Sequence, residues 1–279
     1  MLQLVAMVLA SLLAAGCATE PVVAGAGDLV HIHDLVTDVD GGPLVASHTG
    51  LYRIESIDRA VLVGTERHDL MSMTRTADGR LIIGGHPDLR LEEYRVADKP
   101  PHLGLTESVD GGETWSVIGL LGEADFHALE PVDRGVLAAE STGRIWLLHD
   151  SGQLEQLGAV ESRDLAVDPA DQQRIVSVDF DGDLWLSVDA GFTWNLIDAP
   201  VRYVEVEWGT ELFAMEETGE TWSVAPDGSS WDVVAHGPGN VETFHIDSDD
   251  VWWVTSKGGA IARSDDAGTS WQDVYLPPR

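Results

Sequence analysis

The chain has 279 residues, of which 44% are hydrophobic and ten are tryptophan, so it can build one large domain or two smaller ones around a sizeable core. Its 48 acidic residues against 16 basic ones give a formal net charge of −32. Nucleic acids and anionic membrane surfaces bind through positive patches, and this balance therefore excludes both as expected partners. The acidity is typical of a solvated surface suited to a saline habitat, and a cation-binding surface is the other interpretation.

Residues 1–17 have the pattern of an export signal. An apolar stretch from Leu2 to Ala15 is too short for a comfortable membrane span. It ends in LAAGC, and Cys17 is the only cysteine in the chain. This ending resembles a bacterial lipobox, which implies cleavage before Cys17 and lipidation of its thiol. We therefore expect an exported protein that touches the bacterial cell membrane only through a lipid anchor, with a plain secretory signal as the alternative.

Residues 18–28, with the sequence ATEPVVAGAGD, are small and include proline and glycine, which is typical of a flexible tether. Beyond them an octapeptide recurs: SVDGGETW begins at Ser108, SVDAGFTW at Ser187 and SDDAGTSW at Ser264. Weaker versions begin at residues 56, 148 and 225, so the intervals are 52, 40, 39, 38 and 39 residues. One period of about 39 residues therefore covers residues 29–279, with an insertion in the second unit.

Each period contains several short strand signals. Apolar runs such as PLVAS, GVLAAE and RIVSV are separated by turns rich in glycine and aspartate, and helical periodicity is absent. Four short strands per repeat are typical of a propeller blade. We predict an all-β fold, a single six-bladed β-propeller with four antiparallel strands per blade over residues 29–279, and we expect a monomer.

The octapeptide resembles the Asp-box (BNR) repeat of sialidases and related propellers, which implies a turn between the third and fourth strands of a blade. The chemistry agrees with a structural role, because serine and aspartate side chains can bond the turn backbone and glycine accepts a positive φ. Three strong copies spread around a ring cannot all line one central site. The residues assigned this structural role are Ser108, Asp110, Gly112, Trp115, Ser187, Asp189, Gly191, Trp194, Ser264, Asp266, Gly268 and Trp271.

A functional site is expected on the opposite face, where the second-to-third strand loops and the entries to the first strands converge. Seven of the ten histidines fall on this face of blades 1–3. The long loop from His86 to His102 belongs to the same sector and has the length of a functional lid. The predicted ligand-binding residues are His31, His33, His48, His86, His102, His127 and Arg67.

Imidazoles gathered in this way can bind a divalent metal together with a carboxylate, hydrogen-bond a sugar, or transfer protons. The metal candidates are His31, His33 and His127. The catalytic candidates are Asp34, Asp69, Asp125 and His127. A histidine at a strand entry is also commonly a structural hydrogen-bonding residue, and this interpretation stays open for each of them.

The segments HIHDL, ASHTGLYR, GGHPD and GEADFHALE together resemble bacterial exported proteins of glycosyl-hydrolase or exo-α-sialidase-like type. A sialidase would need three arginines around a carboxylate, for which Arg67, Arg163 and Arg202 are available with Tyr203 and Glu205 nearby, but its Arg-Ile-Pro signature is missing. We therefore expect a lipid-anchored propeller that recognises an extracellular glycan or protein. The alternative is a glycoside hydrolase acting on extracellular glycans.

Overall fold

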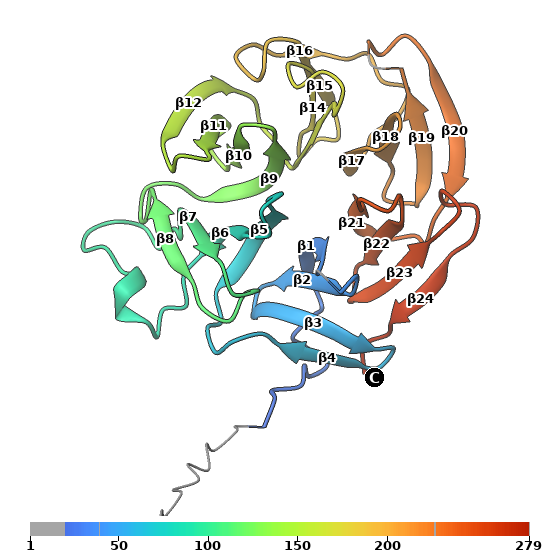
Figure 1. The fold of residues 1–279 in the computed structure, drawn as a ribbon. Helices are drawn as coiled ribbons and strands as arrows, with labels where there is room; N and C mark the ends of the chain where they lie inside the picture. The colour runs from blue at the N-terminus through green and yellow to red at the C-terminus, as the bar shows by residue number, and fades with distance from the viewer. Residues whose placement is uncertain (1–19, 39, 226, 279) are drawn as a thin grey trace, which may run out of the picture.

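The chain folds into six sheets of four antiparallel strands arranged around a central channel (Figure 1). The computed structural model describes residues 20–278, apart from residues 39 and 226. The sequence prediction of an all-β six-bladed propeller with four strands per blade is therefore confirmed. The expected export signal and Cys17 lie outside the described residues.

Each blade is a meander in which consecutive strands pair as neighbours. Blades 1 and 2 comprise β1 (Ile32–Thr37), β2 (Pro43–Ser47), β3 (Gly50–Ser56) and β4 (Arg59–Leu62), then β5 (Asp69–Arg75), β6 (Leu81–His86), β7 (Leu105–Ser108) and β8 (Ser116–Gly119). Blades 3 and 4 comprise β9 (Phe126–Val132), β10 (Gly135–Glu140), β11 (Arg144–His149) and β12 (Leu154–Ala159), then β13 (Asp164–Val167), β14 (Ile175–Val178), β15 (Leu184–Ser187) and β16 (Asn195–Leu196). Blades 5 and 6 comprise β17 (Glu205–Trp208), β18 (Leu212–Met215), β19 (Glu220–Val224) and β20 (Trp231–His236), then β21 (Val241–Ile246), β22 (Trp252–Ser256), β23 (Ala260–Ser264) and β24 (Gln272–Tyr275).

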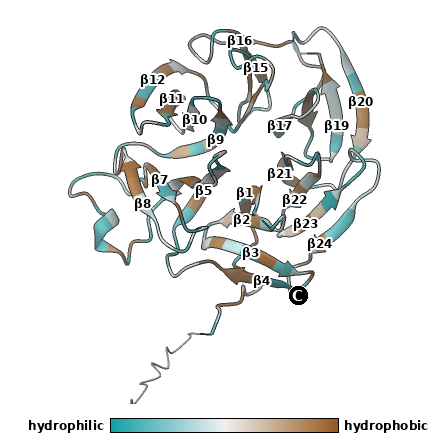
Figure 2. Cartoon of the chain, in the orientation of Figure 1, coloured by the Kyte–Doolittle hydropathy of each residue, from teal (hydrophilic) through white to brown (hydrophobic). Residues whose placement is uncertain are grey.

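The core lies between neighbouring blades, and the second strand of each blade is its most buried element. Every residue of β2, β10, β14 and β18 is buried, and β6 and β22 are buried up to their last residue. A strand packed on both faces must be apolar on both faces, and this explains the continuous apolar runs in these segments. Figure 2 shows hydrophilic residues in the turns and also on outer strands such as β24, whose first two residues are exposed.

Blade 1 consists of the first four strands of the chain and blade 6 of the last four, so no sheet combines strands from both ends of the chain. The ring therefore closes by contacts between these two blades. Ile32 and Val45 of blade 1 share a buried cluster with Trp253 and Tyr275 of blade 6. Backbone hydrogen bonds also join them, from the N–H of Leu276 to the carbonyl of Ile57 at 2.7 Å and from that of Gly258 to the carbonyl of Val30 at 3.0 Å. The closure therefore combines apolar packing with a few hydrogen bonds.

The segment expected to be a flexible tether is in part attached to the propeller. Val23 forms an antiparallel bridge with Val61, and the N–H of Ala24 donates to the carbonyl of Ala60 at 2.9 Å. Ala24 is buried in the cluster that closes the ring. This short pairing covers the outer edge of β4, which a bare blade would leave open.

The three strong octapeptides form the turns between the third and fourth strands of blades 2, 4 and 6. In the copy that begins at Ser187, the N–H of Gly191 donates to the serine hydroxyl at 2.9 Å, and that hydroxyl donates to Asp189 at 2.9 Å. Asp189 also accepts hydrogen bonds from the N–H and the hydroxyl of Thr193, at 2.8 and 2.6 Å. The copies at Ser108 and Ser264 repeat this network. The motif thus closes its own turn.

A second repeated bond, which the sequence analysis did not identify, satisfies tryptophan side chains. The indole N–H of Trp185 donates to Asp179 at 2.8 Å, and that of Trp222 donates to Glu216 at 2.8 Å. Trp253 and Asp247 form the same contact at 2.9 Å. In each case the acid precedes the tryptophan by six residues, and the bond ties a turn to a strand that packs in the core.

The loop between β6 and β7 contains a short 3₁₀ helix, η1 (Glu92–Tyr94), and projects from the periphery of blade 2 beside β8 (Figure 1). The hydroxyl of Tyr94 anchors the loop by donating to Glu66 at 2.9 Å. Only the ends of the loop, at His86 and His102, approach the histidine-rich face. The lid expected from its length is thus directed away from the channel. No helix within the described part of the chain is long and apolar enough to cross a membrane.

Candidate functional site

A cavity of about 610 Å³ occupies the central channel, and its lining extends from the starts of the first strands, as at His33, to their far ends, as at Thr37. The first strands of the blades line it, because they are the innermost strand of each sheet. His33, His127, Arg163 and Phe180 are among its lining residues. Phe180 is 57% exposed, and its ring centroid lies 6.3 Å from that of His127.

A row of alternating imidazoles and carboxylates crosses blades 1–3. Nδ1 of His48, in the β2–β3 turn, lies 2.7 Å from Oδ1 of Asp69 at the start of β5. The other oxygen of Asp69 lies 3.1 Å from Nδ1 of His86 at the end of β6. Nε2 of His86 lies 3.5 Å from Asp125, and the same Asp125 oxygen lies 2.9 Å from Nε2 of His127. The row brings together four blade segments that are up to 79 residues apart in sequence.

Two further histidines lie at the blade 1 end of this row. Nε2 of His33 lies 3.3 Å from Nδ1 and 3.2 Å from Nε2 of His48. The ring of His31 lies 5.8 Å from that of His48, and its Nδ1 contacts Glu242 of blade 6 at 2.7 Å. His31 and His33 thus both approach His48.

The charges of the row follow from these contacts. Burial, together with the neighbouring His48, lowers the pKa of His33 to about 4, so this ring is neutral at physiological pH. Hydrogen bonds to Asp125 and Asp69 raise the pKa of His86 to about 10, so this ring is an imidazolium. Burial opposes ionisation of Asp69 and Asp125, but the hydrogen bonds from their histidines outweigh it and lower both pKa values. The His86 imidazolium therefore lies between two carboxylates, Asp69 and Asp125, at the centre of the row.

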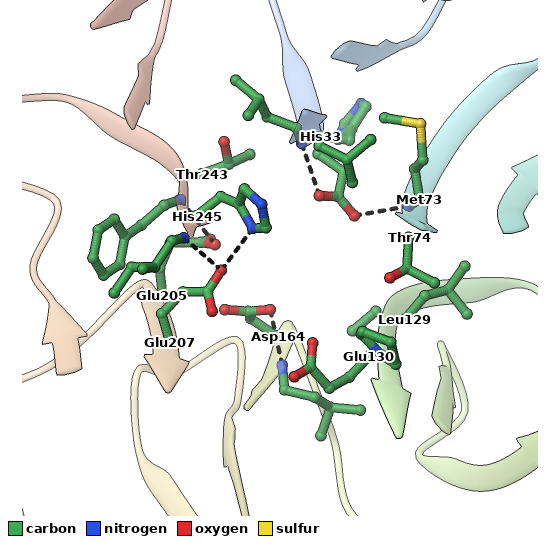
Figure 3. A pocket seen from close by; sticks show the side chains of 18 of the residues that line it. His33, Met73, Thr74, Leu129, Glu130, Asp164, Glu205, Glu207, Thr243 and His245 are labelled. Atoms are coloured by element: carbon green, nitrogen blue, oxygen red, sulfur yellow. Dashed lines mark hydrogen bonds and ion pairs between the residues drawn. The ribbon is translucent and has the colours of Figure 1, made fainter. Parts of the chain in front are cut away.

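A second group of carboxylates lies deeper in the channel and links neighbouring blades. Asp34 accepts a hydrogen bond from the N–H of Met73 in the next blade at 2.7 Å, and Asp164 accepts one from Val206 at 3.0 Å. Glu207 accepts one from Ile246 at 3.2 Å and also lies 2.9 Å from Nδ1 of His245 (Figure 3). Further acids make the same inter-blade contact, namely Glu130 with Val167, Glu205 with Phe244 and Glu242 with Ile32.

Burial dominates the titration of these deeper acids. It raises the pKa of Asp34 and of Asp164 to about 7, and it raises those of Glu130 and Glu205 well above their usual range. Burial also disfavours the charged form of His245, but its hydrogen bond to Glu207 outweighs this and raises its pKa. The side chains of Glu130, Asp164 and Glu207 point toward a common space (Figure 3), where carboxylates close together resist full ionisation.

The structure brings most of the predicted ligand-binding histidines together. His31, His33, His48, His86 and His127 lie on or beside the row, and the ring of His102 lies 6.2 Å from that of His86. The seventh histidine of this sector, His68, is structural, because it is buried between Glu66 and the backbone of Asp88.

The predicted arginines do not gather. The guanidinium of Arg67 donates to the hydroxyl of Tyr52 and does not line the cavity. Arg202 pairs with Asp183 outside the cavity, and Tyr203 is buried with its ring stacked on Trp231. Only Arg163 of the three lines the channel, so the arginine trio of a sialidase is not assembled here.

The candidate catalytic and metal residues divide into separate groups. Asp34 lies in the deeper acid group, whereas Asp69, Asp125 and His127 belong to the row. Among the metal candidates, His31 is directed to Glu242 and His127 to Asp125, while His33 lies against His48. Phe180, Glu242 and the deeper acids other than Asp34 were not predicted as site residues. For the acids, the signal was the recurrence of a carboxylate within the first strand of successive repeats.

No protein-family model and no curated protein sequence matches this chain. Among solved structures, it is similar to a catalytically inactive variant of virginiamycin B lyase from Staphylococcus aureus with quinupristin, at 9% identity and a TM-score of 0.59 over 92% of this chain and 88% of that one. It is similar to YCF48 bound to D1 peptide at 17% identity and a TM-score of 0.55, over 91% of this chain and 84% of that one. A GH74 xyloglucanase from Xanthomonas campestris gives 19% identity and a TM-score of 0.54, over 87% of this chain and 38% of that one. At these identities the likeness shows the propeller fold alone, and the three proteins differ in function.

Proposed function

We propose that this protein is an exported, lipid-anchored propeller that recognises an extracellular glycan at the mouth of its central channel. The observation that carries this proposal is the charged imidazole–carboxylate row at the edge of a cavity of about 610 Å³. Cavities of this size are typical of small-molecule sites, and they fix a ligand through a few placed polar groups. Here such groups converge from blades 1–4.

The lining favours a glycan over a peptide. Imidazole, guanidinium and carboxylate groups offer both donors and acceptors, which is what the hydroxyl groups of a sugar need. The ring of Phe180 stands exposed beside His127 at the mouth, where an apolar face can cover the C–H face of a sugar ring. A protein ligand remains the other outcome of the test.

A glycoside hydrolase needs one carboxyl group with a raised pKa as general acid and a second carboxylate across the bond. At the mouth, Asp69 and Asp125 both have lowered pKa values because imidazoles bond them, so neither is suited to donate a proton. Asp34 has a raised pKa, but two backbone N–H groups engage its oxygens. For these three predicted catalytic acids, the contacts favour recognition over hydrolysis. Turnover of a chromogenic glycoside panel above blank, with and without EDTA, would support the hydrolase instead.

The binding test uses a matched pair of exposed apolar residues on blade 4. Phe180 lies in the β14–β15 turn at the mouth, and Val188 lies in the octapeptide turn on the opposite rim; each is 57% exposed. We expect the labelled wild-type protein to bind members of an immobilised glycan array. Phe180→Ala should weaken this binding at least tenfold, whereas Val188→Ala should leave it unchanged. An array with no bound member, or equal losses in both variants, would contradict the proposal.

The lipid anchor has its own test. Cys17→Ala should move the protein expressed in a bacterium from the detergent phase to the aqueous phase on Triton X-114 partitioning. A wild-type protein that partitions into the aqueous phase would favour the plain secretory signal.

A further inference from the structure

Three side chains at the blade 1 end of the row present ligand atoms to one point. They are His33 at the start of β1, His48 in the β2–β3 turn and Asp69 at the start of β5, and their ligand atoms lie within 4.8 Å of one another. It is the one such group of three found within the described residues. Two imidazoles and a carboxylate from separate strands, rather than a cluster of acids, form this group.

The contact between the two imidazoles is poorly explained as a hydrogen bond. Nε2 of His33 lies almost equally far from both ring nitrogens of His48, at 3.2 and 3.3 Å, so it is not directed at either nitrogen alone. The two rings are inclined at 75°, with centroids 4.3 Å apart. A hydrogen bond is directed at one acceptor atom, whereas ligands around a small cation only need to surround it.

The spacing suits a transition ion. Tetrahedral ligands at about 2.0–2.1 Å from zinc lie about 3.3 Å from one another. Measured from Nδ1 of His48, the separation of 3.3 Å to Nε2 of His33 matches this ligand–ligand distance, and the separation of 2.7 Å to Oδ1 of Asp69 is somewhat shorter. Imidazole ligands suit zinc and neighbouring transition metals, whereas magnesium and calcium are bound mainly by oxygen ligands. A set of two imidazoles and one carboxylate therefore favours an ion of the zinc type.

The surroundings supply the outer contacts that metal sites use. The second oxygen of Asp69 is bonded by His86, and His86 in turn faces Asp125, so the proposed carboxylate ligand is oriented by a further pair. The side chains of His48 and Asp69 are 49% and 31% exposed, which leaves a path for an ion from solvent. His33 lines the cavity, so the third ligand joins this point to the channel.

We propose that His33, His48 and Asp69 bind one divalent transition-metal ion of the zinc type, with a coordination position open toward the cavity. Such an ion would give the mouth of the channel an anchor for an oxygen atom of a ligand. The binding of the ion itself does not require the extracellular ligand.

The test measures zinc on the purified full-length protein. After EDTA treatment and dialysis, wild-type protein should take up about one Zn²⁺ per chain by elemental analysis and titration calorimetry. His48→Ala and His33→Ala should weaken zinc binding at least about a hundredfold, since losing even an outer contact of a metal site costs about 10–100-fold. Mg²⁺ and Ca²⁺ should bind far more weakly than Zn²⁺.

Two control variants distinguish the proposed zinc ligands from other histidines. His127→Ala removes an imidazole at the blade 3 end of the row and should leave zinc affinity within about threefold of wild type. His149→Ala, which removes a ring that pairs with Glu155, should have the same small effect. Because His33 lies within β1 and its replacement can impair folding, Co²⁺ absorption of the more exposed His48→Ala variant provides a second measurement. The spectrum of bound Co²⁺ should be present in wild type and absent in His48→Ala.

Zinc binding of wild type no tighter than that of His48→Ala would overturn the proposal, as would an equal loss in His127→Ala. Either result leaves the glycan proposal standing, because zinc is measured without glycan. Conversely, a silent glycan array with intact zinc binding would leave the metal site in place.

Discussion

The imidazole of His86 donates from Nδ1 to Oδ2 of Asp69 at 3.1 Å, while its Nε2 lies 3.5 Å from Asp125. These two carboxylates belong to adjacent blades, and the shared hydrogen bonds raise the pKa of His86 to about 10. One imidazolium thus offsets two negative charges. It joins the zinc ligands proposed above to the His127 end of the row.

The first prediction concerns this bridge. His86→Ala leaves Asp69 and Asp125 facing each other without the intervening cation, and it should lower the free energy of unfolding. Solvent screens the partly exposed ring, so we expect a loss of about 1 kcal/mol. Urea unfolding in EDTA measures it. His236→Ala, on a ring that is 72% exposed, should change stability by less than about 0.5 kcal/mol. Equal effects of the two substitutions would contradict a role for the bridge.

The second prediction concerns Asp164, an acid that lines the channel. Its pKa is raised to about 7 in the folded protein from an ordinary value of 3.8, because burial disfavours the charged form. Between these two values the unfolded chain loses the proton while the folded chain keeps it. The stability contributed by Asp164 is therefore fully present below about pH 4 and is lost as pH rises to about 7.

Asp164→Asn removes this titration, and the fall in unfolding free energy between pH 4 and pH 7.5 should be smaller than in wild type by roughly 2–4 kcal/mol. Chemical denaturation across this range measures it. Asp189→Asn in an octapeptide turn is the control, because the pKa of that exposed carboxyl is lowered by Thr193 and it titrates below this window. If the unfolding free energies of wild type and Asp164→Asn changed with pH in parallel, the pKa of Asp164 would not be raised by folding.

The octapeptide made the fold accessible from sequence because its chemistry is local. Ser187, Asp189 and Gly191 close their own turn within eight residues, so the motif fixes the strand order wherever it occurs. From that order, His48 and His86 are expected at one end of the blades, and this proximity is what the structure shows. Register sets which end of a blade a residue occupies.

Register does not set which way a side chain points, and there the sequence analysis was incomplete. Arg67 and Arg163 both precede first strands, yet Arg67 turns to Tyr52 while Arg163 lines the channel. Residues between Ile32 and Asp34 shift the pairing of β1 with β2, which period-two alternation does not anticipate. The outward course of the loop between His86 and His102 depends on the anchoring of Tyr94 by Glu66, a contact between distant residues.

The third prediction concerns the octapeptide serines. Ser187 is fully buried and its hydroxyl both accepts from Gly191 and donates to Asp189, so Ser187→Ala should cost about 1–2 kcal/mol of unfolding free energy. Ser108 makes the same bonds two blades away. The loss in the double variant should therefore equal the two single losses together within about 0.5 kcal/mol. Zinc and glycan binding should be unchanged, and a binding defect in either variant would contradict a purely structural motif.

The fourth prediction connects the backbone to the histidine row through Gly85. This residue has φ of 128°, and a Cβ atom there would lie 2.2 Å from the carbonyl oxygen of Asp69. Gly85→Ala must therefore push β5 away from β6 at the point where Asp69 meets His86. We expect a loss of roughly 2–5 kcal/mol of unfolding free energy and weaker zinc binding in the variant that remains folded.

Gly79→Ala provides the matched control for Gly85→Ala, because Gly79 also has a positive φ, of 88°, but a Cβ there meets nothing within 4 Å. It should show only the cost of the left-handed backbone, about 1–2 kcal/mol, with normal zinc affinity. Denaturation and calorimetry on both variants separate the two costs. If both glycine variants bound zinc as wild type does, the close packing of β5 on β6 would not be what positions Asp69.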